Sequence, residues 1–326
     1  MVLWVLSSYR SFAEEISAAA QLAMVLEVSG YPKPGNVHRL QNFEDVRFEH
    51  FLASAIAMGA TLKEAAARGI MAGRDKMPIR EVGVGRYIDR CIRDSNEWHH
   101  GGNTWLGTVM LLVPLAVGAG LSGVKQGAIK LKPLQLAVRR IIKATTMKDT
   151  VQLYRAIRRA EAGGLVNKVE DSPAPDINSP NYVVEIKAGK LSPYDVMKIC
   201  SRWDTICREW ATGFKITFEI GYPALMRFYN KTHDINVATV HTFLTILAAT
   251  PDTLVARKQG MKKARRISAN AKDVLAKGGL LTEEGKCAVG EMDLNLKTHK
   301  NRLNPGTTAD LTASSLMVAV LCGLRP

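Results

Sequence analysis

Residues 29–39 read SGYPKPGNVHR and separate two amphipathic runs of helical periodicity. Two prolines fix φ on either side of Lys33, while Gly30 and Gly35 permit the unusual dihedral angles needed at the two ends of the segment. We therefore expect a stiff loop between two helices. We favour a loop that binds a ligand over a plain turn whose charges are solvated. The segment contains four side chains that can donate to phosphate oxygens, namely Lys33, Asn36, His38 and Arg39.

The rest of the chain shows helical periodicity almost throughout and very little strand-like alternation. The predicted fold class is all-α, a single large multi-helix orthogonal bundle with long loops, and residues 1–326 are predicted to form one domain. Residues 165–182 are irregular and could be a flap over a site or a variable surface excursion. We favour the excursion and give it the bounds 165–191. Helices are expected over 11–28, 46–73 with a break at Gly59, 78–93, 105–121, 130–159, 192–210, 235–247, from 250 onward and 304–321.

The charge balance indicates an anionic partner, since 44 Lys and Arg residues face 30 Asp and Glu residues, for a net charge of +14. Nucleic acid, a membrane surface and a polyphosphate small molecule all satisfy this condition. The five cysteines include no CxxC pair, which argues against a zinc site or a disulfide framework. Reduced thiols and a cytoplasmic location are therefore expected.

No membrane partner is expected from the apolar segments. The first six residues are apolar but lack a basic region, so they make a poor signal peptide. The longest apolar run, residues 105–121, contains Pro114 and is shorter than the roughly 20 residues that span a bilayer. We expect this run to be a buried core helix.

A second polar stretch, WHHGGNTWLG at residues 98–107, leads directly into that apolar helix. Paired glycines let the backbone approach a ligand, Asn103 or Thr104 can cap the helix, and its first amides can bind an anion. A plain cap with a tight turn explains the stretch equally well. His99 and His100 are adjacent and therefore do not share a helix face, so no metal site is expected of them.

Two further stretches begin helices. Asp252 follows Pro251 at a helix start, where the helix dipole alone can explain a carboxylate. That explanation does not extend to Arg257 and Lys258. Near the end of the chain, residues 304–310 read NPGTTAD, with Thr307 and Asp310 at capping-box spacing.

Taken together, these stretches resemble the triphosphoribosyl-dephospho-CoA synthase family, which is all-helical and makes the prosthetic-group precursor for citrate lyase and malonate decarboxylase. The resemblance covers nearly the whole chain and is closest to a divergent, archaeal-like branch. Members that work beside citrate lyase follow the asparagine-threonine pair with histidine and lysine, whereas this chain has Trp105 and Leu106. The motifs are EVSGYPKPGNVHR at 27–39, Gly102-Asn103-Thr104 with Gly107, Asp252-Thr253-Leu254 with Arg257 and Gly260, and Pro305-Gly306-Thr307 with Ala309-Asp310-Leu311.

The resemblance implies an enzyme that joins the triphosphoribosyl group of ATP to the 2′-hydroxyl of 3′-dephospho-CoA and releases adenine. It implies Mg²⁺ as cofactor and three carboxylates, Glu27, Asp252 and Asp310, that ligate the metal or act as the catalytic base. Each carboxylate also has a structural explanation, as an ion-pair partner or a helix cap. The implied substrate-binding residues are Lys33, Asn36, Arg39, Asn103, Thr104, Arg257, Lys258, Thr307 and Thr308.

The expected partners are ATP and a CoA-like nucleotide acceptor, and a homodimer is left open. One alternative keeps a related ATP-dependent ribosyl or nucleotide transferase but changes its acceptor, because Trp105 and Leu106 replace two polar groups. The other is a basic helical nucleic-acid-binding protein that uses residues 130–159 and the run KKARR at 262–266. No recognised nucleic-acid motif accompanies those charges, so no nucleic-acid partner is expected.

Overall fold

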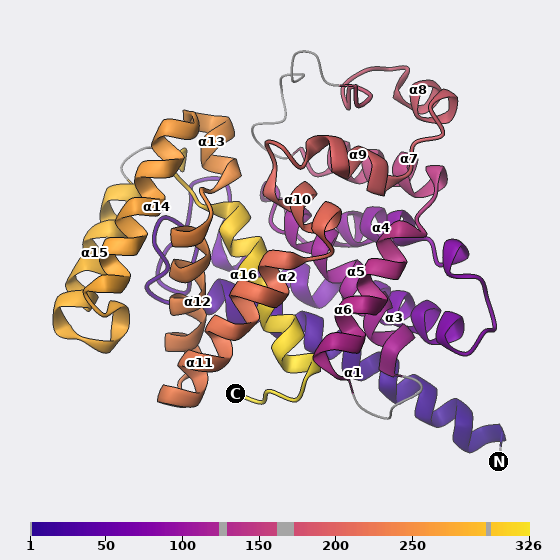
Figure 1. Cartoon of the computed structure of the whole chain (residues 1–326), viewed down its shortest axis with the longest axis horizontal. Helices are drawn as coiled ribbons and strands as arrows, with labels where there is room; N and C mark the ends of the chain where they lie inside the picture. The colour runs from indigo at the N-terminus through magenta and orange to yellow at the C-terminus, as the bar shows by residue number, and fades with distance from the viewer. Residues whose placement is uncertain (1, 124–128, 162–172, 298–300) are drawn as a thin grey trace.

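The computed structural model describes residues 2–123, 129–161, 173–297 and 301–326. Within these ranges the chain folds into α-helices joined by turns and loops, and its pairing of extended backbone is limited to one isolated bridge between His38 and Gln41. The all-α prediction is therefore confirmed. Figure 1 shows helices that cross one another at many angles, with α16 running diagonally beside α12.

The helices follow one another along the chain with few long gaps. Their bounds are α1 Val2–Ser29, α2 Phe48–Ala57, α3 Gly59–Gly73, η1 Ile79–Glu81, α4 Val84–Asn96, α5 Leu106–Gly123, α6 Leu131–Lys143, α7 Met147–Arg159, α8 Tyr182–Ala188, α9 Pro193–Cys200, α10 Thr205–Thr212, η2 Thr217–Gly221, α11 Tyr222–Thr232, α12 Ile235–Ala249, α13 Thr253–Gln259, α14 Met261–Ala276, η3 Gly279–Leu281, α15 Glu283–Lys297 and α16 Gly306–Leu321.

The main core is built around α5, which packs against α1, α3, α6 and α16. Helices α3 and α5 approach backbone to backbone, because a Cβ at Gly69 would lie 2.1 Å from the carbonyl oxygen of Val117. By length and composition α5 is, among the described residues, the one helix that could cross a bilayer, but 89% of it is buried inside the protein. Its predicted place as a core helix is confirmed.

A second, smaller apolar cluster joins α12 to α14 and α15. The loop that follows α1 passes between this cluster and the main core, where Gly35 lies against Leu296 of α15. Figure 1 shows this loop behind α12, close to α15. The loop is therefore held between two packed bodies of helices and not at an open edge.

Several helix boundaries differ from the sequence-based expectations. Helix α1 begins at Val2, so the capping pattern at Ser11 lies inside a helix. The long helix expected over 192–210 is wrong, because it divides into α9 and α10. Asp204 interrupts it by accepting a hydrogen bond from the amide of Cys207 at 3.0 Å, which starts a new helix there.

The region predicted as an excursion, 165–191, is described only from residue 173 onward. Its described part contains the short helix α8 and forms an apolar cluster with Tyr154 of α7 and Val196 of α9. Gly163 and Gly164, a glycine pair that predicts a helix stop from the sequence, lie outside the described residues. That residues 1–326 form a single domain stays a prediction.

Candidate active site

A cavity of about 660 Å³ lies between the loop after α1 and the helices α5, α7, α9, α10, α13 and α16. One side of it is polar and the other is apolar. Three predicted site residues, Arg39, Asp252 and Thr308, are not part of its wall. The predicted residues that do line it are Glu27, Lys33, Asn36, Asn103, Thr104, Arg257, Lys258, Thr307 and Asp310.

The loop after α1 is fixed at both ends by side chains that the sequence-based prediction missed. Asn236 of α12 accepts from the amide of Tyr31 at 2.8 Å and donates to the carbonyl of Tyr31 at 2.6 Å. Asp293 of α15 accepts from the amide of Gly35 at 2.9 Å, and Gly35 has a φ of +72°, which glycine adopts without strain. These two anchors hold the loop in place, which is consistent with the stiff loop predicted from its prolines and glycines.

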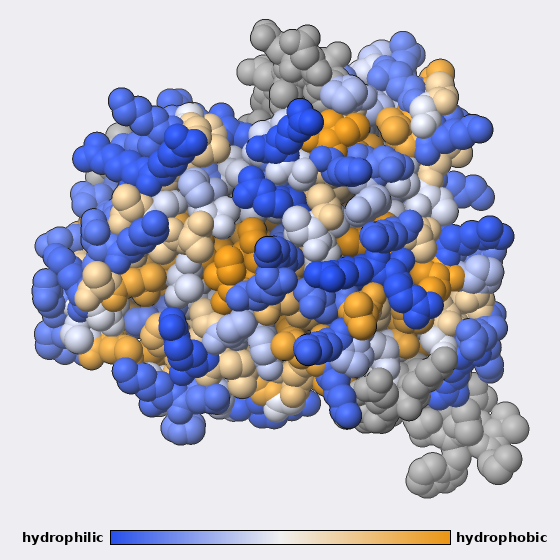
Figure 2. Space-filling model, viewed as in Figure 1, coloured by the Kyte–Doolittle hydropathy of each residue, from blue (hydrophilic) through white to orange (hydrophobic). Residues whose placement is uncertain are grey.

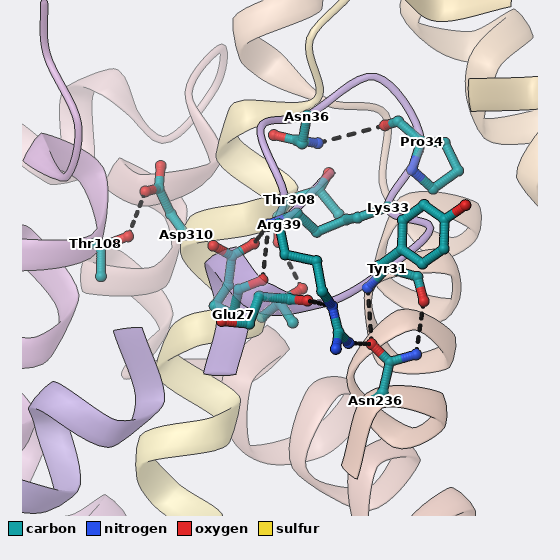
Figure 3. A network of polar contacts seen from close by, with 12 residues as sticks. Glu27, Tyr31, Lys33, Pro34, Asn36, Arg39, Thr108, Asn236, Thr308 and Asp310 are labelled. Carbon is teal, nitrogen blue, oxygen red and sulfur yellow. Dashed lines mark hydrogen bonds and ion pairs between the residues drawn. The ribbon is translucent and has the colours of Figure 1, made fainter. Parts of the chain in front are cut away.

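Lys33 and Glu27 form a buried ion pair at the polar side of the cavity (Figure 3). Lys33 Nζ donates to Glu27 Oε1 at 2.5 Å and to the Glu27 carbonyl at 2.8 Å, and both residues are 1% exposed. Burial raises the pKa of Glu27 and lowers the pKa of Lys33, and each partner opposes the shift of the other. An ammonium has three N–H donors, so one remains for a ligand or for Asp310.

Asp310 projects from α16 toward the start of α5. Its Oδ1 accepts a hydrogen bond from Thr108 Oγ1 at 2.6 Å (Figure 3). Its Oδ2 packs against Gly107, where a Cβ would lie only 2.1 Å away. Burial raises the pKa of Asp310 to about 8, and the nearby Glu27 carboxylate adds to that rise. Without ligands the group is therefore largely protonated at neutral pH, which is unusual for aspartate.

Asp252 joins the starts of two helices and is saturated with hydrogen bonds. Its Oδ1 accepts from the amides of Leu254 and Val255 at 2.9 and 3.0 Å, which caps α13. Its Oδ2 accepts from the amide and hydroxyl of Thr308 at 2.7 and 2.8 Å. The carboxylate therefore ties α13 to α16 behind the wall of the cavity.

These contacts bear on the predicted metal site of Glu27, Asp252 and Asp310. Glu27 is paired with Lys33, and both oxygens of Asp252 are occupied by donors from the protein. Among the described residues, no cluster of three or more acidic, histidine or cysteine side chains is placed to hold a metal ion. Within the described residues the three carboxylates therefore do not form a ready ligand set, and their metal role stays a prediction.

Arg39 lies outside the cavity and faces α12. Its Nε donates to the carbonyl of Ser29 at 2.8 Å, and its Nη2 donates to Asn236 Oδ1 at 2.5 Å (Figure 3). The geometry makes it a brace for the loop.

The remaining polar groups also lie along the polar side of the cavity. Asn103 Oδ1 accepts from the amide of Leu106 at 3.1 Å, so the predicted cap at the start of α5 is confirmed. Arg257 is paired with Asp204, a residue that sequence reasoning did not single out. Burial lowers the pKa of Lys258, and the negative charge of the nearby Asp45 opposes that shift. A capping rule applied to residues 204–207 would have found Asp204, whereas Asn236 and Asp293 show no signal in the sequence.

Comparison with known proteins identifies similar chains of comparable length. A family model described as ATP:dephospho-CoA triphosphoribosyl transferase matches residues 13–325. A 2-(5″-triphosphoribosyl)-3′-dephosphocoenzyme-A synthase of Klebsiella pneumoniae is 25% identical over 310 residues, which cover 92% of this chain and 89% of the relative. A candidate enzyme of the same name from Pseudomonas fluorescens Pf-5 is 25% identical over 314 residues, covering 94% and 91%.

A solved structure has a similar fold. It is the crystal structure of a candidate triphosphoribosyl-dephospho-CoA synthase from Archaeoglobus fulgidus, with a TM-score of 0.59 and 25% identity. The match covers 84% of this chain and all of that one. The similarity therefore extends over most of this chain.

Proposed function

This chain belongs to the ATP:dephospho-CoA triphosphoribosyl transferase family, and from that premise we propose that its cavity transfers the triphosphoribosyl group of ATP to the 2′-hydroxyl of 3′-dephospho-CoA, with release of adenine. One observation carries the proposal for this chain: Glu27, Lys33 and Asp310 meet at the polar side of a single cavity. They come from α1, the loop after it and α16, and two of them belong to a buried charge pair.

The reaction breaks the bond between C1′ of the ATP ribose and its adenine, and forms a bond from C1′ to the acceptor oxygen. The acceptor hydroxyl loses a proton and the departing adenine gains one, so the protons balance. We assign the first of these transfers to Asp310, a buried lining carboxylate that accepts a hydrogen bond from the neutral Thr108 hydroxyl. Positive charge that develops on the ribose is stabilised by the same carboxylate and by Glu27.

The triphosphate is assigned to the polar wall on both sides of Asp310. Lys258 and Arg257 supply positive charge, and Asn103 and Thr307 supply neutral polar groups. Helices α5 and α16 both begin at this wall, and the first amides of a helix favour an anion. Lys33 adds one N–H donor, and its ammonium is held in place by the hydrogen bond to Glu27.

Mg²⁺ is proposed as the counter-ion that arrives with the triphosphate, because the protein groups do not fit a dedicated metal site. Mg²⁺ commonly keeps several waters and binds mainly through substrate phosphates. No step of the proposed reaction passes through a protein-held metal. A cytoplasmic location, a homodimer and the absence of membrane and nucleic-acid partners stay predictions.

A different acceptor is the second candidate function. Trp105 and Leu106 both line the cavity, and the Trp105 indole is held by a hydrogen bond to the carbonyl of Phe51 at 3.0 Å. The cavity wall is therefore apolar at the position where members that work beside citrate lyase carry polar residues. An acceptor less polar than dephospho-CoA near its reacting hydroxyl would suit this wall.

The test is to incubate the purified protein with ATP, Mg²⁺ and dephospho-CoA, and to follow adenine and the adduct mass by liquid chromatography with mass detection. The proposal expects adenine and adduct in equal amounts, and loss of both in Asp310→Asn. If ATP binds but neither product forms, the acceptor assignment fails, and a screen of other hydroxyl-bearing nucleotides decides for the second candidate.

A further inference from the structure

The apolar side of the cavity is formed by elements different from those of the polar side. It is built from α7, α9, α10 and residues 174–177. No cationic side chain from these elements lines the cavity within the described part of the chain, whereas Asp176 does and Glu161 lies beside them. This side therefore repels anions and offers apolar contact instead. Its apolar lining includes Leu153, Tyr154, Ile157, Ile177, Met197 and Ile206.

Residues 174–177 are held in place through their backbone. Tyr154 Oη donates to the carbonyl of Pro175 at 3.0 Å, and Arg158 Nη1 donates to the carbonyl of Ile177 at 3.4 Å. The side chain of Ile177 is half-buried, lines the cavity and packs against the cluster of Tyr154, Ile186 and Val196, whereas these two hydrogen bonds use the backbone alone. Figure 2 shows apolar side chains that reach the surface over α9, between α8 and α10. The apolar side is thus a built wall that continues to the surface.

We propose that this apolar side binds the uncharged pantetheine arm of the acceptor. The inference rests on the proposed function, because it takes dephospho-CoA as the acceptor. That molecule is ADP extended by a long arm with methyl groups, two amides and a thiol. Its diphosphate would be repelled by Asp176 and Glu161, whereas the arm carries no charge and can bury its methyl and sulfur atoms here.

The adenine of ATP fits this side less well. A purine is usually held between flat faces, with polar partners along its edge. The Tyr154 ring is already stacked on Tyr182, with centroids 5.7 Å apart and planes at 15°, and its hydroxyl is used by Pro175. Trp203, between α9 and α10, also lines this side, but most of the other apolar lining is aliphatic or sulfur-containing, which suits a flexible chain.

The test compares ligands with and without the arm. Calorimetric titrations measure the dissociation constants of dephospho-CoA, ADP and ATP for the wild type, Ile177→Gln and Ile177→Trp. The first substitution places an amide in the wall and the second fills the space. Val184→Gln is the matched control. Val184 lies in α8, shortly after Ile177 in the chain, is 65% exposed and does not line the cavity. Thermal unfolding of every variant checks that the fold is kept.

We expect the wild type to bind dephospho-CoA at least about tenfold more tightly than ADP, a difference of about 1.4 kcal/mol. Both Ile177 variants should remove most of this difference, while Val184→Gln keeps it. The proposal is overturned if the wild type binds dephospho-CoA and ADP equally well, or if the Ile177 variants keep the wild-type preference for dephospho-CoA. It is also overturned if these variants weaken the binding of ATP instead. These titrations need no turnover, so a failure of the proposed reaction appears separately, as absent adenine release.

Discussion

Replacing Gly107 by alanine should disable the site while leaving most of the fold intact. The new Cβ would lie 2.1 Å from Asp310 Oδ2 and 2.6 Å from Asp310 Cγ, whereas 3.4 Å is the start of ordinary contact. The carboxyl group must therefore move by roughly 1 Å, and a misplacement of that size costs about a hundredfold in rate. The movement also stretches the hydrogen bond from Thr108, which contributes about 1 kcal/mol.

The assay is kcat/KM for adenine release, together with thermal unfolding. Gly107→Ala is expected to lower kcat/KM by about a hundredfold, with a smaller change in the affinity for ATP. Gly290→Ala is the control, because Gly290 lies in a helix with nothing within 4 Å of an added Cβ. If Gly107→Ala retained activity within about twofold at an unchanged melting temperature, the assignment of Asp310 as the base would be refuted.

Three further predictions concern the buried carboxylates. Lys33→Met should abolish turnover and cost about 3–5 kcal/mol of stability by leaving Glu27 unpaired, and adding Glu27→Gln should restore much of the stability measured by denaturant unfolding but none of the activity. Because the base must be ionised and burial raises the pKa of Asp310 to about 8, kcat/KM should rise with pH and level off above about 8; a flat profile between pH 6 and 9 would contradict the assignment. Asp252→Asn should lower the melting temperature. The new side-chain NH₂ would face protein donors where an oxygen now accepts from them, which costs about 1–3 kcal/mol of stability. An unchanged melting temperature would show that the link between α13 and α16 is unimportant.

Local features of the site could be predicted from the sequence where neighbours in the chain decide them. The stiffness of residues 29–39 follows from its prolines and glycines, and the cap formed by Asn103 follows from its position before an apolar helix. The family motifs also pointed to Lys33 and Asp310, which meet in the cavity.

What could not be predicted depends on partners far away in the chain. Gly35 is anchored by Asp293, 258 residues later, and no local pattern reveals such a contact. Asp252 was expected to face a metal, but Thr308, 56 residues later, occupies one of its oxygens. A short sequence motif shows that a carboxylate is present, but it does not show which donors form hydrogen bonds to it. The apolar side of the cavity was missed for the same reason, since its wall combines α7, α9 and α10.

The position of α16 also has a consequence for how the enzyme becomes active during its synthesis. This helix packs between α1, α5 and α12, and it carries Asp310 to a site whose other members, Glu27 and Lys33, belong to the start of the chain. A ribosome must therefore have synthesised the chain from α1 through α16 before the site can exist. Until then the buried charges of Glu27 and Lys33 lack one wall, and the emerging chain can neither consume ATP nor release adenine.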